Sequence, residues 1–73
     1  MGKTKKAIEK LSKKARAYCG FRQTEIRKYT ASGQTGFVKE EMRKLRGYLQ
    51  CLMDMECITY TDMQALYIFY GTM

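Results

Sequence analysis

The sequence predicts an all-α protein: a helical hairpin of two long amphipathic helices closed by a short third C-terminal helix. The 73 residues include no proline, so the strongest helix breaker is missing. Apolar residues recur at steps of three or four, which is the spacing of one helix face. A segment with two glycines and a later threonine-led segment interrupt this pattern. A chain of this length makes one domain, residues 1–73.

The first predicted helix covers residues 3–30 as one continuous element. One side of it consists of Ile8, Leu11, Ala15, Tyr18, Arg22, Ile26 and Tyr29. Arg22 is the one polar member of this otherwise apolar or aromatic side. If the helix breaks at all, we expect the break at Gly20, because glycine costs about 1 kcal/mol relative to alanine inside a helix.

The second predicted helix follows a loop at residues 31–36, where two glycines and small hydroxyl residues replace the apolar period. Thr35 is a plausible N-cap, so the helix is expected to begin at Gly36 or Phe37 and to end near Glu56. Its apolar positions are Val38, Met42, Leu45, Leu49, Leu52 and Met53. Glu40 and Lys44 are spaced as a supporting ion pair.

The third predicted helix begins after Thr59, which is the expected N-cap, with Asp62 three residues later. Ile58 is expected to contact Met63 across this start, and Gly71 to end the helix. The inner face is predicted to contain Met63, Leu66, Tyr67 and Tyr70. Ile68 and Phe69 are expected to point the other way.

Charge is distributed very unevenly along the chain. All fourteen Lys and Arg residues lie in residues 3–46 against four acids, a formal charge of +10, whereas residues 47–73 contain three acids and no basic residue, a formal charge of −3. Clustered positive charge attracts polyanions, so nucleic acid is the expected partner.

The candidate nucleic-acid-binding residues lie on the first two predicted helices. They are Lys3, Lys6, Lys10, Lys13, Lys14, Phe21, Arg27, Lys28, Lys39, Arg43 and Arg46. On an unbroken first helix, five of them form one row: Lys3, Lys10, Lys14, Phe21 and Lys28. Such a row can follow a phosphate backbone, and Phe21 can stack on an unpaired base. The alternative is an ordinary solvated helix face.

A stripe of Lys39, Arg43, Arg46 and Gln50 on the second helix is expected to extend this surface. If the two helices pack antiparallel, Arg27, Lys28, Lys39 and Arg43 meet near the loop and form the best single anion site. Backbone N–H groups of the loop can add to it. An ordinary capping loop remains the alternative, since the sequence has no GxxxxGK[ST] motif.

The last predicted helix is apolar nearly all round, and its candidate protein-interface residues are Leu66, Ile68, Phe69 and Tyr70. Use of these side chains in the protein's own core is the alternative. The helix contains no Lys or Arg, which argues against a helix-turn-helix that reads bases with its last helix.

Several other classes find no support in the sequence. Three cysteines, no histidine and no CxxC spacing give no metal site, and we expect no cofactor. No catalytic motif is present, so we expect a non-enzymatic protein. No apolar run is long enough to span a bilayer, and the start of the chain lacks the apolar core of a signal peptide, so we expect a cytoplasmic protein.

Three hypotheses remain for the function. The first is a nucleic-acid-binding protein, or a regulator associated with a nucleic-acid complex. The second is an inhibitor or adaptor that binds a protein of a nucleic-acid-processing machine through the basic face or the apolar third helix. The third is a structural homodimer in which the charge maintains solubility.

Overall fold

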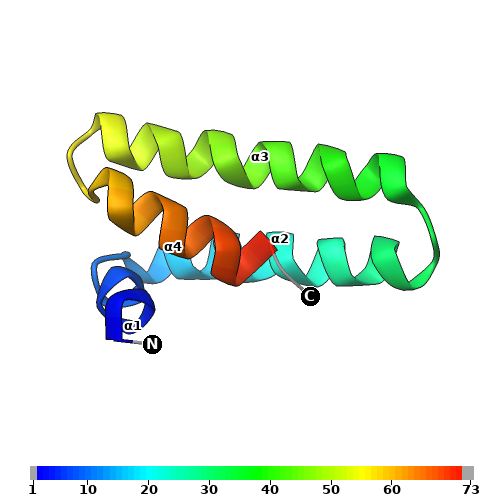
Figure 1. The fold of residues 1–73 in the computed structure, drawn as a ribbon, viewed down its shortest axis with the longest axis horizontal. Helices are drawn as coiled ribbons and strands as arrows, with labels where there is room; N and C mark the ends of the chain where they lie inside the picture. Colours follow the sequence, from blue (N-terminus) through cyan, green and yellow to red (C-terminus); the bar gives the residue numbers. More distant parts are fainter. Residues whose placement is uncertain (1, 72–73) are drawn as a thin grey trace.

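The structure is a computed structural model that describes residues 2–71. It contains four helices and no strand in that range: α1 (Gly2–Glu9), α2 (Lys13–Ala31), α3 (Thr35–Asp54) and α4 (Tyr60–Gly71). The all-α prediction is confirmed, but the first predicted helix is two helices. Figure 1 shows α2 and α3 as an antiparallel hairpin, α4 running back beside both, and α1 crossing the end of the bundle.

The chain turns between α1 and α2 at residues 10–12, and the prediction that residues 3–30 form one helix is wrong. Ser12 has an extended conformation (φ −66°, ψ 165°), and its Oγ accepts a hydrogen bond of 3.1 Å from the N–H of Ala15. Arg16 donates to the carbonyl oxygens at the end of α1, those of Ile8 and Glu9. The first amides and the last carbonyl groups of a helix have no hydrogen-bond partner within that helix. Ser12 supplies a partner at the start of α2 and Arg16 at the end of α1, so the turn is stabilised on both sides.

Gly20, the position at which a break was expected, lies within α2. The turn occurs nine residues earlier because it buries Leu11 (4% exposed) and allows α1 to bury Ala7 against the rest of the molecule. Burial of apolar side chains therefore determines where the helix ends, and the weak local preference of glycine does not.

The loop between α2 and α3 is built around Gly33, whose φ of 73° favours glycine. The N–H of Gln34 donates to the carbonyl oxygen of Tyr29, and that of Gly33 to Thr30, which is a Schellman motif. Gln34 is the N-cap residue of α3 and makes no side-chain capping bond. The prediction that Thr35 caps this helix is wrong, because Thr35 is its first residue.

The start of α4 confirms the predicted capping pattern. Thr59 Oγ1 accepts from the N–H of Asp62 (3.1 Å), and Asp62 Oδ2 accepts from the N–H of Thr59 (3.0 Å). Ile58 and Met63, the predicted contact across this start, are both buried. The helix ends at Gly71 as expected.

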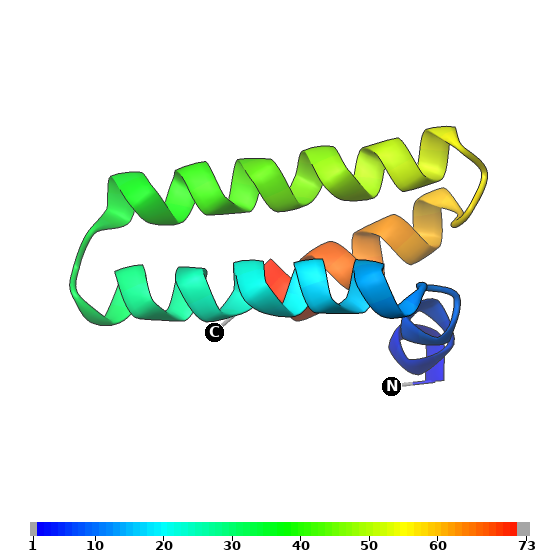
Figure 2. The same ribbon diagram turned by 180° about the vertical axis from the view of Figure 1, so that it is seen from behind.

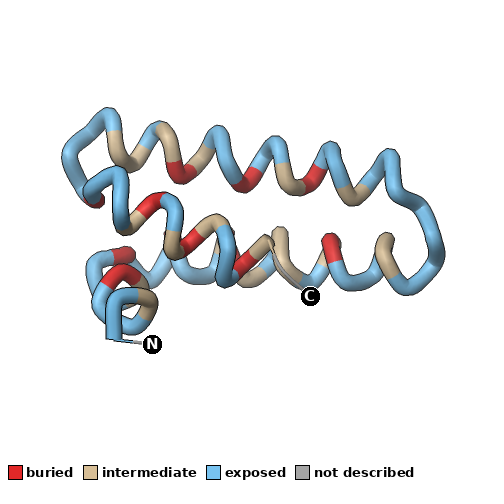
Figure 3. The backbone as a smooth tube through the Cα atoms, in the orientation of Figure 1, coloured by how far each residue is buried: buried red, intermediate tan, exposed pale blue. Residues whose placement is uncertain are grey.

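One core holds the four helices together, and Figure 3 shows its buried positions on the inner sides of the helices. The largest fully buried side chains are Cys19, Ile26, Leu45, Leu49 and Leu66, which come from α2, α3 and α4. As predicted, Met63, Leu66 and Tyr70 face inward, and Tyr67 is partly buried. The last helix therefore closes the hairpin.

Candidate nucleic-acid interface

All eleven predicted nucleic-acid-binding residues are exposed, and four of the fourteen basic residues are neutralised by carboxylates. The four ion pairs are Lys10–Asp62, Arg22–Glu41, Lys28–Glu25 and Lys44–Glu41. Within residues 2–71, the other ten basic side chains have no carboxylate within 4.0 Å. Eight of the ten predicted cations are therefore unpaired within the described residues, but their arrangement differs from the predicted row.

The predicted row along a continuous first helix is not formed. Lys3 lies on α1, and Lys10 lies in the turn, where its Nζ is 2.6 Å from Oδ2 of Asp62. Lys14, Phe21 and Lys28 remain in line on α2 because their spacing of seven residues is nearly two helical turns. Lys28 is neutralised by Glu25 at 2.7 Å. The row therefore retains one unpaired lysine.

This shortened row faces away from α4. Gln23, two residues from Phe21, donates to the backbone carbonyl of Phe69 on α4. Residues two apart lie on nearly opposite sides of a helix, so Phe21 points away from α4. Figure 2 shows the molecule from the side of α2 that α4 does not cover. Phe21 is 52% exposed, and the Arg22 guanidinium lies 4.9 Å from the centroid of its ring.

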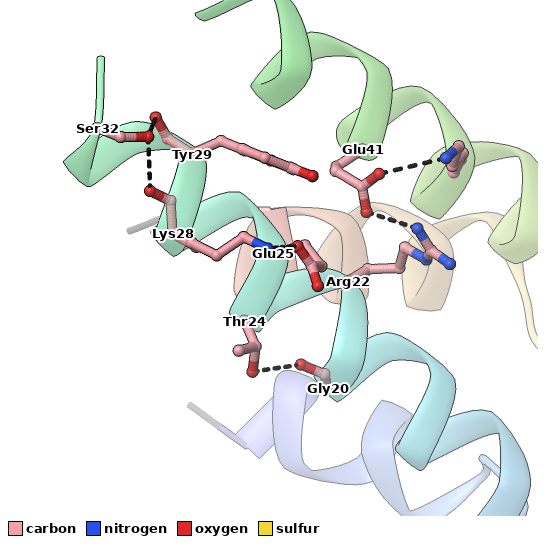
Figure 4. A network of polar contacts seen from close by, with 9 residues as sticks. Gly20, Arg22, Thr24, Glu25, Lys28, Tyr29, Ser32 and Glu41 are labelled. Atoms are coloured by element: carbon pink, nitrogen blue, oxygen red, sulfur yellow. Dashed lines mark hydrogen bonds and ion pairs between the residues drawn. The ribbon is translucent and has the colours of Figure 1, made fainter. Parts of the chain in front are cut away.

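The contact between α2 and α3 contains an ion-pair network that the sequence did not reveal. Glu41 is buried (6% exposed) and accepts from Arg22 at 2.5 Å and from Lys44 at 3.3 Å (Figure 4). The predicted Glu40–Lys44 pair is therefore replaced by Glu41–Lys44. The one signal in the sequence was Arg22 itself, since an arginine within an apolar stripe requires a carboxylate partner.

Two aromatic stacks lie beside this network and join the same two helices. The rings of Tyr18 and Tyr48 are 4.1 Å apart, and those of Tyr29 and Phe37 are 5.1 Å apart. Burial raises the pKa of Tyr48. The aromatic stacks hold α2 and α3 together, and Glu25 and Glu41 neutralise most of the positive charge beside them.

The four residues of the predicted anion site near the loop are not all free to bind one anion. Arg27 and Lys28 are successive residues and so point about 100° apart on α2, and Lys28 is already paired. Lys39 lines a hollow with Thr30 and Val38, and neither Arg27 nor Lys28 lines that hollow. The expected stripe on α3 borders α4, since Arg46 lines a hollow with Tyr60 and Tyr67 of that helix. It does not extend the surface of the α2 row.

The structure gathers positive charge most densely where α1 meets α2, and we call this region the basic corner. It consists of Lys3, Lys5, Lys6, Lys10, Lys13, Lys14 and Arg16. The bonds from Arg16 to the last carbonyls of α1 hold its two parts together. Lys10 is the one member of the corner that is paired to a carboxylate among the described residues. The predicted set omitted Lys5 and Arg16.

The predicted interface residues on α4 divide into two pairs. Leu66 (0% exposed) and Tyr70 (7%) belong to the core and are not accessible to a partner. Burial raises the pKa of Tyr70. Ile68 (65% exposed) and Phe69 (45%) remain at the surface and line a groove between α4 and α1, which we call the α1–α4 groove.

The remaining chemistry of the described residues is limited. Burial raises the pKa of the Cys19 thiol to about 11, so this thiol is unreactive at neutral pH. In residues 2–71 no three Cys, Asp or Glu side chains lie together as a metal site requires. None of the described helices is long and apolar enough to cross a membrane.

Comparison with protein-family models, curated proteins and solved structures finds no match, so the functional argument rests on this chain alone.

Proposed function

We propose that this protein is a small, non-enzymatic, cytoplasmic protein that acts as a regulator by binding the phosphate backbone of nucleic acid, either free or within a nucleic-acid-associated complex. The observation that carries the proposal is the basic corner. Six of its seven cations have no carboxylate partner among the described residues: three lie on α1, which is about 12 Å long at 1.5 Å per residue, and three lie in the first turn of α2. Three free cysteines suit a reducing compartment.

The basic corner has the electrostatics of a phosphate-binding surface. Each lysine that approaches a phosphate releases a condensed counterion, which favours binding at low salt. Lys6, Lys13 and Lys14 are fully available for this purpose because they are exposed and unpaired within the described part of the chain. The interaction should therefore weaken steeply as salt is added.

Recognition of the backbone is favoured over the reading of base edges. Contacts from lysine to phosphate fix the position of a protein on nucleic acid but carry no sequence information. The apolar helix α4 offers no basic side chain that could enter a groove. Phe21 lies two helical turns beyond Lys14 and, being 52% exposed, can stack on an unpaired base.

The test is a fluorescence anisotropy titration against single-stranded and double-stranded DNA and RNA at about 50 and 200 mM salt. The variant Lys6→Gln/Lys13→Gln/Lys14→Gln removes three cations from the basic corner. We expect at least a tenfold rise in Kd at the lower salt. The log–log salt slope should become shallower by about 2 to 2.7, since each phosphate contact contributes roughly 0.7 to 0.9.

The matched control is Lys39→Gln/Arg43→Gln/Arg46→Gln, which changes the net charge equally but alters the stripe on α3. It should raise Kd less than threefold. Equal losses from the two triple variants would mean that the net charge acts without a local site. No binding by the unmodified protein at the lower salt would overturn the proposal for all four nucleic acids.

The α1–α4 groove favours a second candidate function, a protein-binding inhibitor or adaptor of a nucleic-acid-processing machine. Two exposed apolar side chains on one helix are typical of a protein contact. The third candidate, a structural homodimer, would use the same groove. Sedimentation equilibrium at micromolar concentration separates these candidates, because a monomer contradicts the homodimer.

A further inference from the structure

The α1–α4 groove is a hollow of about 880 Å³ beside the helix that carries no basic residue. We propose that it binds an amphipathic helix of a protein partner whose apolar side enters the groove and whose acidic side chains face α1. The groove shares Lys3 and Lys5 with the basic corner, whereas Lys6, Lys13 and Lys14, the lysines changed in the nucleic-acid test, do not line it. The two proposals can therefore be tested with different variants.

The apolar wall of the groove is a helix stripe. Ala65, Ile68 and Phe69 occupy positions i, i+3 and i+4 of α4, and Ile8 of α1 lies across from them. Ile68 is 65% exposed and Phe69 is 45% exposed, although both belong to a helix whose other side forms the core. Removing such surface from water is worth about 25 cal/mol per Å², so a partner gains affinity by covering it.

The charged wall of the groove determines the chemistry of the partner. Lys3 and Lys5 line the side formed by α1, and neither has a carboxylate within 4.0 Å among the described residues. Glu9 is the one acid in the lining. The side formed by α4 carries no charge there. Complementarity therefore requires apolar side chains over α4 and acids along α1.

A second copy of the chain fits this groove poorly. A two-fold pair brings the same surface of each copy together, so two α1 lysines from each copy would approach with Glu9 as the one acid of each lining. The acid that α4 could contribute, Asp62, is already bonded to Lys10 and to the N–H of Thr59. Charge thus favours a different, acidic protein.

A helix fits better than an extended peptide because the walls are side chains of two helices, with no exposed strand edge to pair with. The length of α4, twelve residues, is about 18 Å at 1.5 Å per residue. A bound helix of about three turns would match it, with apolar anchors at i, i+3, i+4 and i+7.

The test is a selection from a displayed library of helical 16-residue peptides (about four and a half turns), in which apolar and charged residues are varied at every outward position. Peptides are selected on the unmodified protein and counter-selected on Phe69→Asp. We expect enriched peptides to be amphipathic and acidic. When these peptides are synthesised, their Kd should be at least tenfold higher for Phe69→Asp than for the unmodified protein. The same increase is expected for Ile68→Glu, which changes a more exposed residue.

Two matched controls make the result specific. Phe37→Asp introduces the same change at another exposed phenylalanine (57% exposed) outside the groove, and it should leave peptide binding unchanged. Lys3→Glu/Lys5→Glu should raise the Kd of the acidic peptides at least tenfold. It should lower the Kd of versions in which each acid is replaced by lysine. Circular dichroism of each variant checks that it remains helical.

The outcomes are distinct. Enriched peptides that are basic, or that bind Phe69→Asp as well as the unmodified protein, overturn the proposal, and so does a selection without enrichment. A dimer that Phe69→Asp dissociates also overturns it, because a second copy would then occupy the groove. None of these results bears on the nucleic-acid titration, in which Phe69→Asp should behave as the unmodified protein does.

Discussion

Glu41 shows how a single residue can connect two helices, because its partner on α2, Arg22, lies 19 positions earlier in the sequence. It is the one buried charged residue in the described part of the chain. Its carboxylate accepts hydrogen bonds from Arg22 of α2 and from Lys44 of its own helix. Burying a carboxylate is costly unless cations and hydrogen bonds compensate for the lost water. The network therefore specifies how α2 and α3 align.

We expect Glu41→Leu to lower the free energy of unfolding by about 3 kcal/mol, because Arg22 then keeps its charge in a site that is 84% shielded from water and loses its carboxylate. The double variant Arg22→Met/Glu41→Leu should return to within about 1 kcal/mol of the unmodified protein, since two apolar side chains can fill the same space. Urea unfolding measures both. A double variant as unstable as the sum of its single changes would contradict this account.

The helix boundaries illustrate the next scale, that of the element. Ser12 caps α2, whereas Gly20 lies inside it and has open space where a Cβ would be. Similarly, both ends of the hairpin use Schellman motifs, with Gly33 at one and Glu56 (φ 61°) at the other. Capping bonds and burial thus define the helices more strongly than glycine content does.

Gly20→Ala should therefore raise the free energy of unfolding by about 0.5 to 1 kcal/mol, because alanine removes the entropic cost of glycine without a clash. For a chain of this size, 1 kcal/mol corresponds to a rise in Tm of roughly 4 to 8 °C. Ser12→Ala should lower stability by about 1 kcal/mol by leaving an amide unsatisfied. Thermal unfolding followed by circular dichroism checks both, with Gly33→Ala as a control that should destabilise.

The start of α4 gives an element-level prediction about pH. The Lys10 ammonium and the N–H of Thr59 hold the pKa of Asp62 below its ordinary value of 3.8. A lowered folded pKa means that the carboxylate stabilises the fold above the unfolded pKa, and that this contribution is lost as pH falls through the folded pKa. We expect the unmodified protein and Asp62→Asn to differ in stability at pH 6, and this difference to shrink as the pH falls below the ordinary pKa of 3.8.

Urea titrations at pH 6, 4 and 2.5 measure this difference. Lys10→Gln is the control: it removes the first cause of the shift but keeps the bond from Thr59, so its pH dependence should lie between those of the other two proteins. A constant difference between the unmodified protein and Asp62→Asn across this pH range would show that Asp62 makes no charge-dependent contribution.

At the scale of the whole molecule, a bundle of 35 × 24 × 20 Å carries seven of its fourteen basic residues in the basic corner. A core this small supplies only about 3 to 5 kcal/mol, so every helix depends on the same few buried side chains. Leu66 is fully buried where α4 closes the hairpin. One core shared by all four helices favours cooperative folding.

Leu66→Ala should remove about 2 to 5 kcal/mol and so bring the whole chain close to unfolding. All four helices should be lost in one transition, because α1 and α4 pack together and α4 packs on α2 and α3. Circular dichroism and tyrosine fluorescence should report the same midpoint in urea. Loss of helix without change around the tyrosines would mean that α1 or α4 unfolds alone.

The sequence determined those features that depend on local chemistry. The helix content, the loop near Gly33, the capping box of Thr59 and Asp62, and the inward side of α4 followed from spacing and capping rules. The charge of each segment of the chain could also be predicted, because it is the sum of the charges of its residues. Exposure of Ile68 and Phe69 followed from the same helical period.

Only the tertiary structure decided the rest. The turn at Ser12, the burial of Glu41 and the pairing of Lys10 with Asp62, 52 positions away, depend on which helices meet. These contacts neutralise part of the predicted row and leave the basic corner and the α1–α4 groove available for partners. Local propensities of about 1 kcal/mol cannot predict such pairings, since burial of the common core outweighs them.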